Sequence, residues 1–241
     1  MVTEAQSERT TLSRRTVIET ALAIGDREGL DAISLRRIAR DLSVTPMALY
    51  RYVDSKERLL SGMIELAFEE FAFPAGSESD WREEMRALAR SFRRLLVTHP
   101  AVTALFSAHP ADSVSQNGAR IVEFVLGVLR RAGFPPREAA LLESECERFI
   151  LGLVVIELNN GPQPCPFNPK AHAHSREAQA QLAQLPPDEF PHLLEALPYF
   201  SECQDADWVF EFALDLIVGG LERMLELKRW GTDEPEPSSL S

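Results

Sequence analysis

Apolar residues recur at three- and four-residue spacings along most of this chain, and the alternation typical of strands is almost absent. Leu35, Ile38, Ala39 and Leu42, for example, follow the i, i+3, i+4, i+7 pattern of a helix with one buried face. Capping residues and prolines divide these stretches into separate helices. The sequence therefore predicts an all-α fold with four short N-terminal helices and a larger helical body.

Length and charge exclude several classes of protein. The 241 residues are enough to bury a core without disulfides or a structural metal, and the net charge of −12 excludes a uniformly basic nucleic-acid coat. The longest apolar run, 149–156, is far shorter than the roughly 20 residues of a membrane span, and the polar N-terminus does not resemble a secretory signal. Three cysteines without a C-x-x-C pair favour reduced thiols. We therefore expect a cytoplasmic protein with no membrane partner.

Charge is distributed unevenly along the chain. Between Ser34 and Arg58 basic residues outnumber acidic ones, whereas the rest of the chain is strongly acidic. Such asymmetry is typical of proteins that bind a polyanion at one end. A solvated charged face is the alternative, and charge alone favours it.

Two short helices joined by a tight turn, Ser34–Leu42 and Thr45–Val53, have the proportions of a helix-turn-helix. In this motif the second helix enters the major groove of DNA, and the first supports it. The positions that would pack the two helices together are apolar: Ile38, Ala39, Val44 and Leu49.

The outer positions of the second helix suit contact with DNA. Tyr50 and Tyr52 offer hydroxyl groups to phosphate oxygens, and Pro46 and Met47 can pack on a thymine methyl group or the groove wall. Lys56 stands in the first turn of the next helix, where the helix dipole disfavours a cation unless a phosphate is held there. Taken alone, Lys56 is better explained as an ordinary exposed lysine.

The stretch RRTVIETALAIGDREGLDAISLRRIARDLSVTPMALYRYVDSKERLLSGMIE resembles the DNA-binding domain of TetR/AcrR-type transcriptional regulators. The resemblance covers about residues 11–71, with the helix-turn-helix at 34–53, and rests on spacing, caps and polar pattern together. Two positions depart from the family pattern: Arg51, and Ser43, where glycine is frequent and where we expect the turn to need a positive φ. The DNA contacts that the resemblance implies are Ser34, Arg36, Thr45, Pro46, Met47, Ala48, Tyr50, Tyr52 and Lys56.

The body, residues 80–230, resembles more loosely the ligand-binding domain of the tetracycline-repressor subgroup. In that subgroup histidines and a glutamate hold a magnesium–antibiotic complex. The corresponding positions here are Leu105, Arg148 and Ile156, with Glu157 displaced by one residue. The spacing of Cys165, His172 and His174 fits no metal site. We therefore expect no metal, no cofactor and no catalytic residue, and we expect 231–241 to be a disordered acidic tail.

The last helix is apolar on nearly all sides between Trp208 and Leu221, so a partner surface is expected, although complete burial within one chain is the alternative. Together with the helix at 136–159, it predicts a homodimer built on a four-helix bundle. Residues 162–198 hold many prolines and are expected to be mostly loop. The body could line a pocket for a small apolar or aromatic effector, although most of its aromatic residues would serve as core. The candidate pocket residues are Phe68, Phe92, His99, Phe106, His109, Phe124 and Phe149.

These features predict a homodimeric, sequence-specific DNA-binding transcriptional regulator. We expect a repressor that a small-molecule effector releases from a palindromic operator. The alternatives are a ligand-dependent activator or corepressor-type regulator, or a non-regulatory DNA-binding or interaction module on the same fold. An enzyme is not expected, because the sequence shows no nucleophile–base pair and no paired inward carboxylates.

Overall fold

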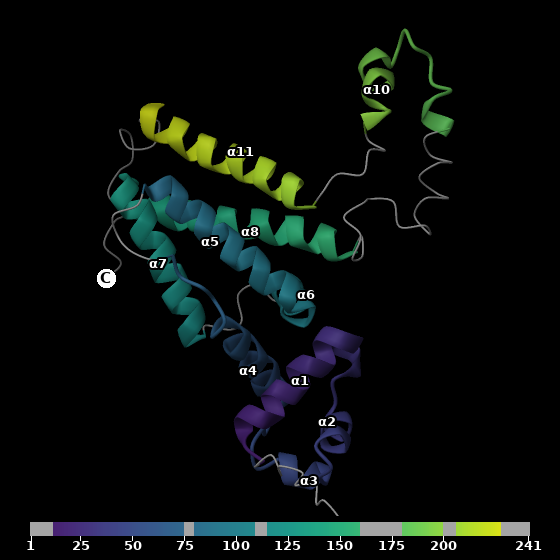
Figure 1. The fold of residues 1–241 in the computed structure, drawn as a ribbon, viewed down its shortest axis with the longest axis vertical. Helices are drawn as coiled ribbons and strands as arrows, with labels where there is room; N and C mark the ends of the chain where they lie inside the picture. Colours follow the sequence, from purple (N-terminus) through teal and green to yellow (C-terminus); the bar gives the residue numbers. More distant parts are fainter. Residues whose placement is uncertain (1–11, 75–79, 109–114, 160–179, 200–205, 228–241) are drawn as a thin grey trace, which may run out of the picture. The chain divides into compact units, whose positions relative to one another are not determined.

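The computed structural model describes residues 12–74, 80–108, 115–159, 180–199 and 206–227, and these residues form helices and no strands (Figure 1). The all-α expectation is confirmed. The chain divides into two units, of which unit 1 is Met1–Ser77 with Arg90–Gly127, and unit 2 is Glu78–Ala89 with Val128–Ser241. Unit 1 thus extends beyond residues 11–71, because α6 (Pro100–Ala108) packs on α1 (Arg14–Glu28) and α4 (Lys56–Phe68).

The N-terminal helices of unit 1 begin where serines cap them. Ser13, Ser34 and Ser55 accept hydrogen bonds from the backbone N–H groups of Thr16, Arg37 and Arg58. These bonds satisfy donors that a helix leaves unpaired at its start. The caps position α1, α2 (Leu35–Asp41) and α4, and the four-residue α3 (Pro46–Leu49) starts at a proline after Thr45.

Close packing between α1 and α6 explains a glycine inside a helix. From the sequence, Gly25 and Gly29 are both expected at the end of the first helix. Gly29 is its C-cap, whereas α1 continues through Gly25 to Glu28. A Cβ atom at Gly25 would lie 2.8 Å from Cβ of Ala101 in α6 and 3.0 Å from Cδ1 of Ile33. Gly25 therefore permits a close approach of the two helices rather than ending one of them.

Unit 2 contains the first half of α5 (Trp81–Thr98), the end of α7 (Gln116–Ala132), α8 (Pro136–Asn159) and α11 (Ala206–Leu227). α8 packs on α11, and a short α10 (Pro191–Ala196) lies between them in the sequence. Three ion pairs fix α5 within the unit: Arg82 with Glu222, Arg86 with Asp215, and Arg131 with the buried Glu84. The large side chains buried most completely in this unit are Val128, Leu129, Phe134, Val154 and Leu214.

Several expectations fall outside the described residues: His109, the tail 231–241, the cysteine and histidines of 165–174, and part of the proline-rich segment. One element is shorter than expected. The second helix of the motif ends at Leu49 instead of Val53, because the N–H groups of Tyr52 and Val53 both turn back to the carbonyl oxygen of Leu49.

The turn between α2 and α3 holds a serine in a left-handed conformation. Ser43 has φ 55°, the only positive φ of a non-glycine residue in the described part of the chain. Its N–H donates to the carbonyl of Arg40, and the N–H of Val44 donates to that of Ala39, which closes α2 with a Schellman motif. The expectation that this turn requires a positive φ at Ser43 is confirmed.

Replacing Ser43 by glycine is expected to stabilise the protein. A residue other than glycine in the left-handed conformation costs about 1–2 kcal/mol. Glycine removes this cost, but its greater freedom in the unfolded chain offsets part of the stabilisation. We expect Ser43→Gly to raise the free energy of unfolding by about 0.5–1 kcal/mol in urea denaturation. Ser43→Ala keeps the strained backbone and should give no such gain; an equal gain from alanine would contradict this explanation.

Candidate nucleic-acid interface

The two helices of the motif are held together by an apolar inner side and by ion pairs. Ile38 of α2 and Leu49 of α3 are fully buried. Arg37 of α2 places Nη2 2.5 Å from Oε1 of Glu28 in α1 and Nη1 2.5 Å from Oδ1 of Asp41. These contacts raise the pKa of Arg37, chiefly through the hydrogen bond to Glu28. Arg37 therefore serves to fix α2 on α1 rather than to meet a ligand.

The outer side of α3 is open to solvent. Met47 is 76% exposed and Tyr50 is 55% exposed, which is unusual for side chains of this size. Thr45 caps α3 without a side-chain hydrogen bond, so its hydroxyl group is available to another acceptor. Pro46 is exposed beside them, and Ala48 is half-buried. An apolar and hydroxyl-bearing surface thus protrudes from the end of unit 1 that α3 occupies.

Four cations in the same stretch of chain have no acidic partner among the described residues. Among the described residues, Arg36, Arg40, Arg51 and Lys56 are exposed and form no ion pair. Arg58, in contrast, pairs with Asp54 at 3.2 Å. Unpaired exposed cations next to exposed aromatic and apolar side chains suit a polyanion with readable edges, as duplex DNA is.

The side chains of Ser34 and Tyr52, two expected phosphate contacts, already interact in part with the rest of the protein. The Ser34 hydroxyl oxygen accepts from Arg37 N–H at 3.2 Å, which leaves its hydrogen free to donate. Tyr52 is half-buried after α3, while Lys56 begins α4 directly after the Ser55 cap. The nine expected DNA contacts thus lie in α2 and α3 with their N-caps, in the turn that follows α3, and at the first residue of α4.

Ring contacts within unit 1 involve three of the expected pocket residues. Phe68 of α4 contacts Phe106 of α6 with ring centroids 5.5 Å apart, and Phe124 of α7 contacts Phe73 at 5.4 Å. Phe92 is half-buried on α5. Phe149 lies instead on the exposed side of α8 and is 43% exposed. His99 is buried but engaged with carboxylates, as described below.

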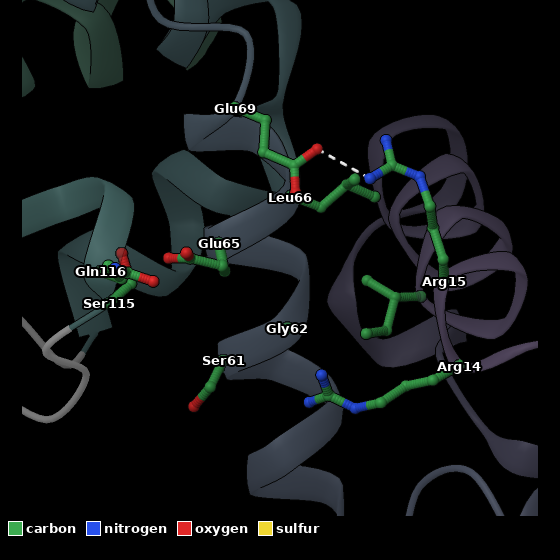
Figure 2. A pocket seen from close by; sticks show the side chains of 10 residues that line it. Arg14, Arg15, Ser61, Gly62, Glu65, Leu66, Glu69, Ser115 and Gln116 are labelled. Carbon is green, nitrogen blue, oxygen red and sulfur yellow. Dashed lines mark hydrogen bonds and ion pairs between the residues drawn. The ribbon is translucent and has the colours of Figure 1, made fainter.

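An open hollow in unit 1 is lined by other residues. Figure 2 shows it between the start of α1, the middle of α4 and the start of α7, with a volume of about 610 Å³. Arg15 pairs with Glu69 at 2.8 Å on one side, and Arg14 extends toward Ser61 on another. The Glu65 carboxylate accepts from the N–H of Asn117 at 3.2 Å, so a side chain of α4 caps α7.

Sequence reasoning missed two glutamates on the inward side of α8. Glu143 and Glu147 continue the stripe of Ala139 and Ile150, yet neither forms an ion pair with the described residues. Burial raises the pKa of both carboxyl groups. Burial, with the nearby charges of Glu143 and Glu145, also raises the pKa of the Cys146 thiol to about 11, so this free cysteine stays a protonated, unreactive thiol at neutral pH.

A second apolar surface lies on α8 and α11. Its members, which we call the outer face, are the exposed Leu141, Phe149, Ile156, Trp208, Phe212 and Leu216. Trp208 and Phe212 stack with centroids 5.6 Å apart. Nothing in the described chain lies within 4 Å of a Cβ atom built on Gly152, Gly219 or Gly220, so another backbone could approach there.

A capped helix-turn-helix whose second helix exposes its outer side is typical of one class of protein, the helix-turn-helix DNA-binding proteins. Family comparison agrees with the geometry. Residues 17–63 match the model of bacterial regulatory proteins of the tetR family, and residues 73–225 match the tetracyclin repressor-like C-terminal domain. The chain belongs to the TetR family of bacterial transcriptional regulators.

Relatives cover nearly the whole chain. The chain is 26% identical to an HTH-type transcriptional regulator of Saccharopolyspora erythraea over 87% of this chain and 84% of the relative. It is also 26% identical to the class D tetracycline repressor protein of Escherichia coli, over 89% and 91%. The crystal structure of the Streptomyces coelicolor TetR family protein ActR in complex with actinorhodin superposes with a TM-score of 0.75 at 26% identity, covering 88% of this chain and 97% of ActR.

No helix among the described residues is long and apolar enough to cross a membrane. The positions that hold magnesium–antibiotic complexes in the tetracycline-repressor subgroup have other uses here: Leu105 is buried, Arg148 pairs with Glu145, and Ile156 lies on the outer face. The described residues contain no group of three or more histidine, cysteine, aspartate or glutamate side chains suited to a metal.

Proposed function

We propose that the protein is a homodimeric repressor that binds a palindromic operator through α2 and α3 and releases it when a small effector binds. The observation that carries the proposal is the exposed side of α3, where Met47 and Tyr50 protrude among unpaired cations. Packing alone gives no reason to expose these side chains, whereas insertion into the major groove does.

Each residue has a defined part in this interface. Arg36, Pro46, Met47 and Ala48 face the bases or groove wall. The side chains with hydroxyl or ammonium groups bind phosphates and fix the position of the helix. These phosphate contacts are Ser34, Thr45, Tyr50, Tyr52 and Lys56.

The outer face forms the dimer. Side chains as large as Ile156 and Leu216, 61% and 60% exposed in the single chain, are expected to be covered in solution. Pairing α8 and α11 across a two-fold axis buries both stripes in a four-helix bundle. The dimer presents two copies of α3 about 34 Å apart, one helical turn of DNA.

The effector is a small apolar or aromatic compound bound in the body. The complex of ActR with actinorhodin supports this class of ligand for a protein of similar fold and sequence. Phe92, Phe106 and Phe124 remain candidate pocket residues, while the position of Phe149 favours the dimer surface.

The proposal is tested with labelled duplexes tiled across the DNA that flanks the coding sequence. Fluorescence anisotropy is measured at about 0.1 M and 0.2 M salt in the presence of random-sequence competitor. We expect one palindromic duplex to be bound at least about 1000-fold more tightly than the competitor. Equal binding to every duplex would contradict sequence-specific regulation.

Effector release is tested on the same complex. Aromatic compounds, beginning with actinorhodin, are titrated into the protein–duplex complex, and the loss of anisotropy is compared with ligand binding measured by calorimetry. Release of the duplex supports a repressor. A compound that binds the protein and tightens its hold on DNA would instead identify a corepressor-type regulator.

A further inference from the structure

A buried histidine connects three segments of unit 1. His99 lies between the end of α5 and the start of α6 and is 8% exposed. Its Nδ1 atom is 2.8 Å from Oδ2 of Asp26 in α1, and its Nε2 atom is 3.3 Å from Oε2 of Glu70, just after α4. We call these three residues the His99 cluster. It joins α6 to α1 and to the end of α4.

The number of protons on the ring decides how many of these contacts can form. A neutral imidazole carries one N–H and can donate to one carboxylate, while its other nitrogen has a lone pair. The imidazolium carries two N–H groups and donates to both. Carboxylates at both nitrogens of His99 are therefore satisfied together only when the ring is protonated.

No other ionisable group among the described residues competes for the ring. α6 and the last turn of α5, residues 95–98, carry no titratable side chain. Of the charged residues next to Asp26 and Glu70 in the sequence, Arg27 forms an ion pair with Glu28, and Glu69 forms one with Arg15. The hydrogen bond that His99 donates to Asp26 raises the pKa of His99, burial opposes the rise, and the hydrogen bond to Glu70 adds to it.

The two carboxylates are not equivalent. Asp26 is 18% exposed, and its Oδ1 also accepts the N–H of Ala101 at 3.1 Å, so it is held at the start of α6 with or without the proton. Glu70 is 60% exposed and has His99 as its partner among the described residues. When the ring loses a proton, the remaining N–H stays with Asp26, and Glu70 turns to water.

The contact with Glu70 matters because of what α4 connects. Lys56, an expected phosphate contact, is the first residue of α4, and Glu70 follows its last turn. We propose that protonated His99 is a positioning residue that fixes the end of α4 to α6, so that operator affinity falls as the pH rises. The DNA part of this inference rests on the proposed function; the proton-dependent contact does not.

The direction of the pH effect follows from the raised pKa. A group whose pKa is higher in the folded protein contributes stability below its unfolded pKa and loses it as the pH rises through the folded value. The link between α4 and α6 is therefore complete in mildly acidic solution and is lost above the folded pKa of His99.

The contact itself is tested by NMR titration of the histidine rings in the full-length protein. The His99 signal is assigned by its loss in His99→Gln or, if that variant does not fold, by its shift in Glu70→Gln. We expect a pKa above 6.5 in the wild type and a lower value in Glu70→Gln. A wild-type pKa at or below 6.5, or one unchanged by Glu70→Gln, would overturn the inference whether or not an operator is known.

The consequence for DNA is tested by measuring operator affinity from pH 6.5 to 9 in wild type and Glu70→Gln. The wild-type dissociation constant should rise about fivefold more than that of the variant over this range. Two controls separate the cluster from general effects. Glu65→Gln removes another carboxylate contact of α4, the cap on α7, and His192→Gln removes an exposed histidine; both should keep the wild-type pH slope.

Each outcome is decisive. A steeper slope in the wild type than in Glu70→Gln, with the controls following the wild type, supports the positioning of α4 by the proton on His99. Parallel slopes for wild type and Glu70→Gln would overturn it. If no duplex is bound specifically, the proposed function fails, and hydrogen exchange of amides 66–70, compared between wild type and Glu70→Gln across the same pH range, decides the proton-dependent link.

Discussion

Leu216→Glu is expected to convert the dimer to a monomer and to weaken operator binding by more than about 100-fold. Leu216 is exposed on the outer face of α11, so a charge there is harmless in the isolated chain. In the dimer, the same charge would be buried against the apolar side chains of the partner without a cation, which costs several kcal/mol. A monomer binds each half of the operator independently. It therefore loses the high effective concentration that the dimer has for the second half-site once the first is bound.

Analytical ultracentrifugation measures the change in mass, and circular dichroism checks that the helices persist. Ile156→Glu on α8 should act in the same way, because its side chain is equally exposed on the same face. Tyr199→Glu is the matched control, since Tyr199 is 62% exposed but lies outside α8 and α11. A dimer that survives both charge variants would exclude the outer face as the interface.

Lys56→Ala is expected to weaken operator binding about tenfold and to lower the dependence of affinity on salt. Each phosphate contact releases counterions, and a dimer makes this contact twice, so the slope of log affinity against log salt should fall by about two. The loss should be similar for the operator and for random DNA, because phosphates carry no sequence information. Tyr52→Ala should show the same pattern.

Arg36→Ala is expected to act differently, since a base contact is worth about 1–3 kcal/mol of discrimination. It should reduce the preference for operator over random DNA more than it reduces affinity for random DNA. Arg58→Ala is the matched control for both variants: Arg58 is exposed on α4, but Asp54 already neutralises it. If Arg58→Ala weakens binding as much as Lys56→Ala, the assignment of the phosphate contacts is wrong.

Local signals predicted much of the fold. The expected range 136–159 agrees with α8 at both ends, because Pro136 fixes its start and helical periodicity continues without interruption. Ser34, with its hydrogen bond to Arg37, begins α2 as expected from its capping chemistry. Where one or two neighbouring residues determine the backbone, the sequence is sufficient.

Errors arose where tertiary packing decided the outcome. The length of α3 was overestimated because Tyr50 to Val53 continue the apolar and polar pattern of a helix while the backbone turns. Gly25 resembled a helix end, but its neighbour Ala101 is distant in sequence. Periodicity cannot distinguish a glycine that ends a helix from one that admits a second helix.

The polar clusters were beyond the reach of the sequence for a similar reason. His99 could be recognised only as a histidine before a proline at a helix end. Its partners Asp26 and Glu70 are 73 and 29 positions away. The candidate DNA contacts, in contrast, all lie within one short stretch of chain, so a resemblance over that stretch could name them together.

The contacts of α6 with α1 and α4 limit how this regulator can be recombined with others. A chimaera joined between Glu70 and the start of α5 would take Asp26 and Glu70 from one parent and His99 and Ala101 from the other. Such a graft would place unmatched groups against a buried imidazole and would press a foreign side chain against Gly25. A crossover after α6 would keep Asp26, Glu70, His99 and Ala101 together with the helix-turn-helix of the same parent. It is therefore the better junction for engineering new sensor–operator pairs.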